Sequence, residues 1–192
     1  MKMLFKNPAL WWRFEGRYYH KNLYRGVKNL IKWFKIVWKD RDWDHTYIYE
    51  VLRFKLEDQA YGIGSRDLHI GAKREAEKML LCARLCQIQI DSMYEMEYAD
   101  YMETTYEFVP TDETKQYYTM ETEVVKDNLD EYFALYPRQY KRVMNGEVKW
   151  FGKITDTTDR KEIAMAIAYE NQNRSRKLLF KIMEQNIEGF WD

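Results

Sequence analysis

The chain is short of the residues that interrupt helices. It has three prolines and eight glycines among 192 residues, with no glycine between Gly71 and Gly146 and no proline between Pro8 and Pro110. Hydrophobic residues make up 46% of the chain and aromatic residues 17%, so disorder along its whole length is excluded. We therefore predict a single, mainly α-helical domain over residues 1–192, built as a helical bundle around one long central helix.

The sequence also has few cysteines. Cys82 and Cys86 are the two in the chain, four residues apart, a separation at the edge of what a disulfide spans on one helix. We interpret them as reduced thiols that serve as small core residues. No stretch is apolar for long enough to form a signal peptide or a membrane span, so we expect a cytoplasmic protein with no membrane partner.

Neither sign of charge is in excess. Lysine plus arginine and aspartate plus glutamate each number 31, so the chain has no global field to attract nucleic acid or an anionic membrane. The charges are nevertheless separated along the chain, because the segment 95–123 is acidic and an early segment is basic. That polarity can steer a small anion or pair two subunits. The early basic residues are Lys21, Arg25, Lys28, Lys32, Lys35 and Lys39.

Helical periodicity divides most of the chain into predicted helices. After an aromatic arm over residues 1–20, a helix is predicted from a cap at Asn22 to Trp38, and a second runs from Asp44 to the region of Gly62 and Gly64.

The strongest pattern spans residues 67–97. It predicts one continuous helix that buries Met79, Ala83, Cys86 and Ile90. So long an apolar stripe leads us to expect a homo-oligomer.

The remaining residues predict shorter elements and a last long helix. Residues 107–158 form an expected insertion or arm, with a short helix over 128–136 that ends at Pro137 and an extended segment over 148–154. Asp159, followed three residues later by Glu162, has the pattern of a capping box at the start of the last helix.

Three carboxylates gather between the first two predicted helices. Asp40, Asp42 and Asp44 match the first ligand positions of a calcium-binding loop. The sixth position is His45 instead of the glycine of such loops, and the twelfth is Val51 instead of glutamate. We therefore expect no bound metal, and we interpret these carboxylates as helix caps and ion-pair partners.

Several motifs resemble a known group of proteins. They are W-F-K-I-V-W-K-D-R-D-W-D-H over residues 33–45, Y-I-Y-E-V-L-R-F-K-L over residues 47–56, and the ending L-L-F-K-I-M-E-Q-N-I-E-G-F-W-D. In these motifs the chain resembles a family of small, uncharacterised tailed-phage (Caudoviricetes) proteins. The resemblance covers the region 33–94 and about the last 15 residues, and it implies a virus-encoded accessory protein that works in the bacterial cytoplasm.

Catalytic motifs are scarce. The sequence has no P-loop, no glycine-rich dinucleotide turn and no serine nucleophile elbow. A helical nucleotide pyrophosphohydrolase would need an E-x-x-E helix followed by an E-x-x-D helix, and only Glu97–Asp100 supplies such an element. We therefore expect a binding protein without a cofactor, although the sequence alone leaves catalysis open.

Arginines and aromatic rings offer another kind of site, because bases stack on rings and phosphates accept the guanidinium fork. Arginines and aromatic residues also build protein cores and surfaces without binding a ligand. The candidate ligand-binding residues are Trp38, Arg41, Trp43, His45, Arg53, Lys55 and Arg84.

Three functions remain open from the sequence. The first is sequestration of a small anionic ligand, such as a nucleotide signal of a host defence system. The second is inhibition of a host protein through the acidic helix and the arm. The third is metal-dependent phosphohydrolysis with Asp40, Asp42, Asp44 and His45.

Overall fold

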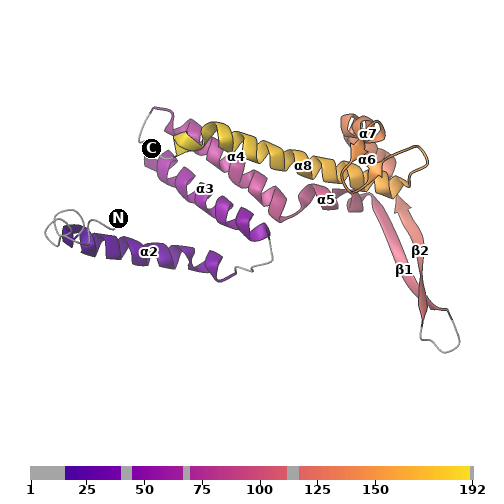
Figure 1. Ribbon diagram of the computed structural model, residues 1–192, viewed down its shortest axis with the longest axis horizontal. Helices are drawn as coiled ribbons and strands as arrows, with labels where there is room; N and C mark the ends of the chain where they lie inside the picture. The colour runs from indigo at the N-terminus through magenta and orange to yellow at the C-terminus, as the bar shows by residue number, and fades with distance from the viewer. Residues whose placement is uncertain (1–15, 40–44, 67–69, 112–116, 191–192) are drawn as a thin grey trace. The chain divides into compact units, whose positions relative to one another are not determined.

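The computed structural model describes residues 16–39, 45–66, 70–111 and 117–190, which form helices, one long β-hairpin and one very short one (Figure 1). The prediction of a mainly α-helical bundle is confirmed. The chain divides into two compact units, Met1–Tyr47 and Ile48–Asp192, and each is described by itself.

The first unit is built on one amphipathic helix. A 3-10 turn, η2 (Gly16–Tyr18), leads into α2 (Tyr19–Val37). The helix begins three residues before the predicted cap, so Asn22 lies inside it. Its first residue follows Tyr18, which makes no side-chain capping hydrogen bond. None of the residues of α2 is buried.

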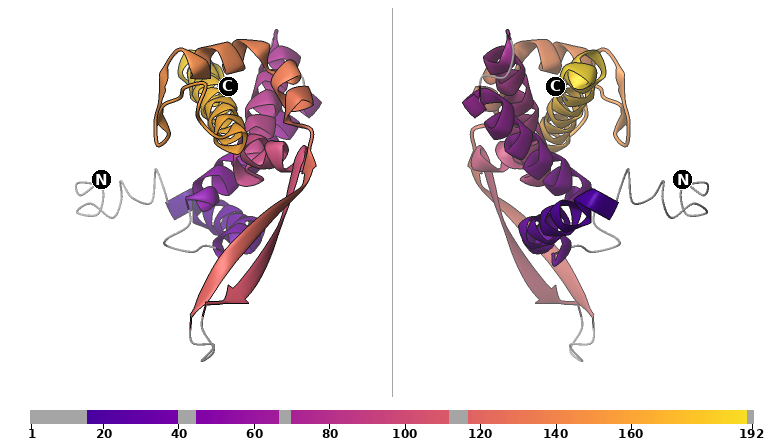
Figure 2. Two further views of the ribbon diagram at one scale, coloured as in Figure 1. Left: turned by 90° about the vertical axis from the view of Figure 1, so that its right-hand side faces the viewer. Right: turned by 90° about the vertical axis from the view of Figure 1, so that its left-hand side faces the viewer.

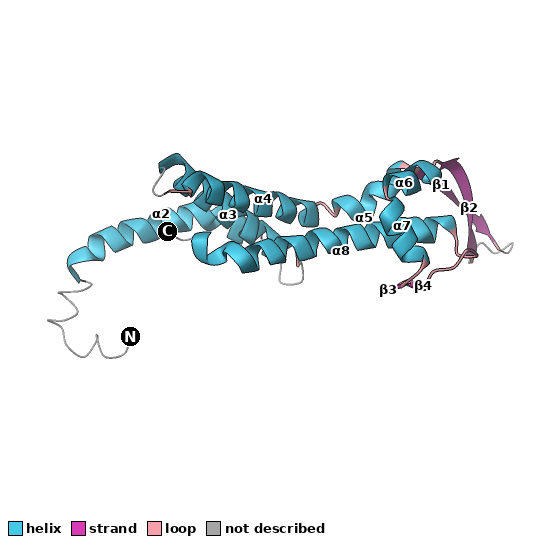
Figure 3. Cartoon of the chain, turned by 90° about the horizontal axis from the view of Figure 1, so that it is seen from above, coloured by secondary structure: helices cyan, strands magenta, loops and turns pink. Residues whose placement is uncertain are grey.

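In the second unit, three helices surround the first of two cores. These are α3 (Thr46–Arg66), α4 (Ala72–Ile90) and the C-terminal half of α8 (Arg160–Asn186), which continues as η4 (Ile187–Phe190). Figure 3 shows α8 lying alongside α4 and α5. The buried residues of this core are Leu56, Ala60, Ile63, Ala72, Ala76, Met79, Cys82, Ala83, Leu85, Cys86, Leu179 and Phe190.

Helix α3 ends at Arg66, two residues beyond Gly64 in the predicted region, and both Gly62 and Gly64 lie inside it. A Cβ atom at Gly64 would lie 3.2 Å from the Cβ of Ala76 in α4. The glycine therefore permits close approach of two helices rather than ending one of them.

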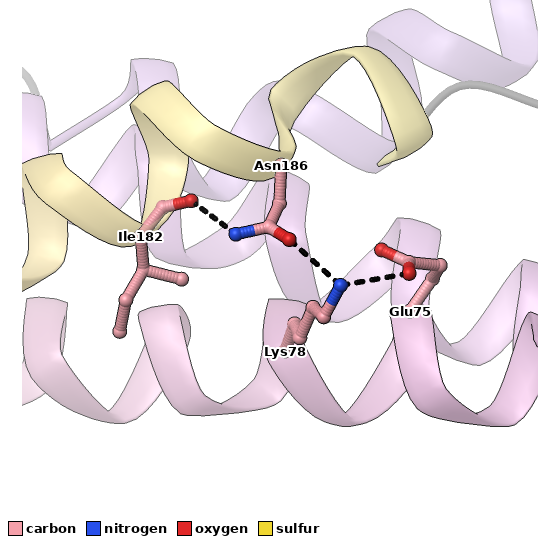
Figure 4. A network of polar contacts seen from close by, with 4 residues as sticks. All are labelled: Glu75, Lys78, Ile182 and Asn186. Atoms are coloured by element: carbon pink, nitrogen blue, oxygen red, sulfur yellow. Dashed lines mark hydrogen bonds and ion pairs between the residues drawn. The ribbon is translucent and has the colours of Figure 1, made fainter.

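A polar network also joins α4 to the end of α8 (Figure 4). The ammonium of Lys78 donates to the Glu75 carboxylate at 2.9 Å and to Oδ1 of Asn186 at 2.7 Å. The amide of Asn186 in turn donates to the carbonyl of Ile182 at 2.8 Å. The network fixes the orientation of the Asn186 side chain, whose oxygen faces α4.

The predicted continuous helix over 67–97 is wrong, because α4 ends at Ile90. Ser92 adopts a left-handed conformation with φ of 46°, after which α5 (Met93–Glu97) and the 3-10 turn η3 (Tyr98–Asp100) follow. The backbone N–H of Tyr94 donates to Gln172 Oε1 at 3.3 Å. A side chain of another helix thus takes a donor that a continuous helix would use internally.

The burial expected from that segment is partly confirmed. Met79, Ala83 and Cys86 are buried, whereas Ile90 is half-exposed at the break. Residues of α3 and α8 in the same chain cover this apolar stripe, so the reason for expecting a homo-oligomer from it no longer holds. The longest described helix is α8, with 27 residues, rather than the segment 67–97.

The second core lies around the N-terminal half of α8. It includes α6 (Leu129–Leu135), α7 (Pro137–Met144) and the two-residue strands β3 (Glu147–Val148) and β4 (Gly152–Lys153). The expected short helix over 128–136 is present. Pro137 does more than end α6, because it also occupies the first turn of α7, where its missing N–H costs no helical hydrogen bond.

A two-stranded antiparallel ribbon joins η3 to α6. Strands β1 (Met102–Pro110) and β2 (Tyr118–Asp127) pair along their whole lengths, and every residue of β2 is exposed. Figure 2 shows the ribbon extending from the helices of this unit. The ribbon spans residues 102–127, whereas the segment expected as an insertion or arm, 107–158, also includes α6 and α7, which pack in the second core.

Candidate functional site

Polar side chains interrupt the buried face of α8 between its two cores. Asn171, Gln172 and Ser175 are all buried, in a helix whose inward face is otherwise apolar over Ile163–Ala168 and at Leu179. A buried polar group that lacks a hydrogen bond lowers stability, so such a group needs a partner or a function.

Two of these three side chains are held by the neighbouring helices. The amide of Gln89 donates to Oγ of Ser175 at 2.5 Å, and the amide of Gln172 donates to the carbonyl of Ile88 at 3.1 Å. Because Gln172 also accepts the N–H of Tyr94, it links the end of α4, the start of α5 and the middle of α8. The hydrogen bond from Gln89 fixes Ser175, which lines an adjoining cavity.

That cavity has a volume of about 400 Å³, within the range of small-molecule sites. Four of its lining residues lie on one face of α8, and the others come from α4, α5, the α6–α7 junction and α7. The lining residues are Leu85, Tyr94, Tyr136, Gln139, Asn171, Arg174, Ser175 and Leu178.

The third buried polar side chain, Asn171, lines the cavity without a partner for its amide nitrogen. Nδ2 is buried and has no hydrogen bond to any described residue. An amide donor left in this state is ready to bind an acceptor atom of a ligand.

Arg174 supplies the positive charge of the cavity. It lies three residues after Asn171 on the same face of α8 and is exposed to solvent. Among the ion pairs formed by described residues, none involves Arg174. Its guanidinium is therefore available to a phosphate or carboxylate of a ligand.

Two half-buried tyrosines provide aromatic surface. The hydroxyl of Tyr136 donates to Oε2 of Glu97 at 2.6 Å. Burial raises the pKa of Tyr136, and the hydrogen bond to Glu97 raises it further, so the phenol stays neutral in the physiological range. Tyr94, from α5, lines the same cavity.

None of the described site residues that were predicted from the sequence lines this cavity. Trp38 is exposed at the C-terminal end of α2, with its ring 5.4 Å from that of Phe34. His45 is exposed just before α3. Arg41, Trp43 and the carboxylates Asp40, Asp42 and Asp44 lie outside the described residues.

The three other candidates also do not line the cavity. Arg53 and Lys55 are half-buried on α3, and Arg53 forms a 3.8 Å ion pair with Glu57. Arg84 is exposed on α4. Among the described residues no group of three or more His, Cys, Asp or Glu side chains is placed to hold a metal ion.

Sequence reasoning missed Tyr94, Tyr136, Gln139 and Asn171 as site residues. Arg174 was not predicted as a site residue either. The usable signal was in the last helix, because three polar residues, Asn171, Gln172 and Ser175, occupy buried positions on the otherwise apolar inward face of α8. The tyrosines carried no comparable signal, since 16 tyrosines are spread along the chain.

Comparison with known proteins gives no match to any protein-family model, to any curated protein or to any solved structure. Within the described part of the chain, no helix combines the length and the apolar character that crossing a bilayer requires.

Proposed function

We propose that the cavity between α4, α5, α7 and α8 binds a small anionic ligand that carries a planar ring, with the chemistry of a nucleotide. The observation that carries the proposal is the presence, in one cavity, of an arginine that forms no ion pair with a described residue and a buried amide nitrogen with no hydrogen-bond partner among the described residues. Two tyrosines in the same cavity offer the aromatic surface on which a base stacks.

Each lining residue has a role in this proposal. Arg174 binds the phosphate through its planar fork of N–H donors. Asn171 donates to an acceptor on the ring or the sugar, and Gln139 offers both a donor and an acceptor. Tyr94 and Tyr136 contact the ring, and Glu97 keeps the Tyr136 hydroxyl oriented.

The proposal extends to the biological setting implied by the motif resemblance. We propose that the protein is a phage accessory protein of the host cytoplasm that sequesters its ligand, such as a nucleotide immune signal, without turning it over.

We also propose a homo-oligomer, because the ribbon leaves Tyr106, Phe108 and Met120 exposed on one face. Light scattering at micromolar concentration measures the oligomeric state, and a monomeric mass would reject the proposed homo-oligomer.

Calorimetry with a panel of nucleoside mono-, di- and cyclic phosphates tests ligand binding. We expect at least one to bind, and the variant Arg174→Gln to lose roughly 10- to 100-fold in affinity, as for other hydrogen bonds to a charged group. Arg176→Gln is the matched control: Arg176 is an exposed arginine on the same helix that bonds to Asn173 and does not line the cavity. No binding by any of the panel, or equal losses in the two variants, would refute the proposal.

A second candidate function is binding of a host protein through the ribbon. One face of β1–β2 carries the exposed apolar side chains of Tyr106, Phe108, Tyr118 and Met120, and a two-stranded ribbon has little stability of its own. Phe108→Ser should abolish such an interaction and leave nucleotide binding unchanged. This outcome separates the two functions.

A further inference from the structure

The apolar face of α2 is exposed among the residues that the structure describes in its unit. Its side chains Leu30 and Ile31 are 74% and 73% exposed, and Trp38, at the end of the helix, is 77% exposed. At 100° per residue, the apolar positions from Leu23 to Trp38 fall within an arc of roughly 120°. Those positions are Leu23, Val27, Leu30, Ile31, Phe34, Val37 and Trp38.

The opposite face of α2 carries charge of one sign. The helix contains no aspartate or glutamate, and its five lysines and arginines lie on the side opposite the apolar arc. Helix α2 is therefore strongly basic, although the net charge of the whole chain is zero. Those residues are Lys21, Arg25, Lys28, Lys32 and Lys35.

We propose that α2 lies in the interface of an anionic lipid membrane, with its apolar face among the lipids and its basic face toward the headgroups and water. The expectation of no membrane partner depended on the lack of a long apolar stretch, which an interfacial helix does not need. A high amphipathicity, a basic polar face and Trp, Phe and Leu on the other side are the features of such interfacial helices. Phe34 and Trp38 supply aromatic residues favoured at the headgroup level.

A second copy of α2 fits this surface less well. Two-helix coiled coils bury a narrow seam, and charged residues beside the seam pair the helices. In α2 the positions beside the seam carry Ile31, Trp33 and Trp38, so the apolar face is wider than a two-helix contact covers. No acidic residue of α2 is present to form ion pairs with the lysines of a partner copy.

A bilayer also attracts more of the basic residues of α2 than a protein groove would contact. A groove would contact the apolar face and leave charges on the far side of the helix unused. The potential of an anionic membrane extends for a Debye length of about 8–10 Å, comparable to the diameter of a helix. Lysines around the whole polar face are therefore attracted to the membrane.

Sedimentation of the full chain with lipid vesicles tests the proposal. We expect binding to vesicles of phosphatidylcholine mixed with phosphatidylglycerol, weaker binding to phosphatidylcholine alone, and loss of binding as salt is raised. Leu30→Glu, and separately the pair Lys28→Glu and Lys35→Glu, should each reduce the bound-to-free ratio by roughly tenfold or more.

Matched variants in the second unit serve as controls. Leu80→Glu repeats the change at an exposed leucine of α4, and the pair Lys177→Glu and Lys181→Glu repeats the charge reversal on the exposed face of α8. Both should bind vesicles like the unchanged chain. Equal binding to both lipid mixtures, no binding to either, or equal losses in the controls would overturn the proposal. A change of oligomeric state in Leu30→Glu without any vesicle binding would assign the face to a second copy instead.

Discussion

The hydroxyl of Tyr136 donates a 2.6 Å hydrogen bond to the carboxylate of Glu97, 39 residues earlier in the chain. It joins the α6–α7 junction to the end of α5, so two walls of the cavity are held together by one contact. Tyr132 packs edge-on against Tyr136 with ring centroids 5.3 Å apart, which places this contact at the border of the second core. The cavity is thus supported by the packing of the second core rather than by a loop.

Tyr136→Phe should lower the free energy of unfolding by about 1–2 kcal/mol, because it removes a donor from a half-buried carboxylate and keeps the ring. Chemical denaturation measures the change. Tyr140→Phe is the control, since this half-buried tyrosine of α7 makes no hydrogen bond through its hydroxyl to a described residue. If both variants were equally stable, the Tyr136–Glu97 contact would not hold the cavity walls together.

Stability should fall as pH rises above about 9. Burial raises the pKa of Cys82 to about 11 and that of Cys86 to about 12, from an ordinary value of 9.0. Between pH 9.0 and the raised pKa of each thiol, the unfolded chain loses protons that the folded chain keeps, so the free energy of unfolding falls as pH rises. Burial also raises the pKa of Tyr132 and Tyr136 above 10, so these tyrosines likewise lower the stability of the folded chain at high pH.

Urea unfolding at pH 8 and pH 11 measures this dependence. Replacing both cysteines by alanine should make the decline of stability with pH shallower, whatever it does to stability at pH 8. Tyr61→Phe removes an exposed tyrosine and should leave the slope unchanged. An unchanged slope in the cysteine variant would show that the thiols do not cause the alkaline loss.

The helical part of the fold was predictable because local patterns determine it. The stripe of α2, the short helix after Asn128 and the start of α8 at Asp159 all follow from apolar spacing and from residues that favour helix ends. Asp159 is indeed the residue before α8, although its side chain makes no capping hydrogen bond.

The parts that sequence reasoning missed depend on contacts between distant residues. The break at Ser92 accompanies a hydrogen bond from Tyr94 to Gln172, which lies 78 residues away. The start of β1 at Met102 was not predicted, because each strand is stabilised by the other and not by its own periodicity. The cavity combines residues from four helices and a junction, so no single segment carried its signature.

Glu121→Lys should stabilise the ribbon. Glu107 and Glu121 are direct cross-strand partners, and like charges in that position repel. Lysine at position 121 would pair with Glu107 instead, a change of about 0.2–1 kcal/mol. Amide hydrogen exchange of β1 and β2 reports local opening and should slow. Glu123→Lys, opposite Thr105, should have a smaller effect, and equal slowing in the two variants would contradict the cross-strand explanation.

The acidic segment before α3 should be stabilised by protein cations and helix ends, not by a metal ion. Asp40, Asp42 and Asp44 repel one another, and the calcium-loop pattern lacks its glycine and its final glutamate. We therefore expect Asp44→Ala to lower stability by about 1 kcal/mol, as for a lost helix cap, both with and without EDTA. Melting curves with calcium, magnesium or EDTA measure this. A metal-dependent rise in melting temperature that disappears in Asp42→Asn would contradict the prediction, because a carboxamide is a poorer ligand for a hard cation than a carboxylate, and it would favour a metal-dependent phosphohydrolase.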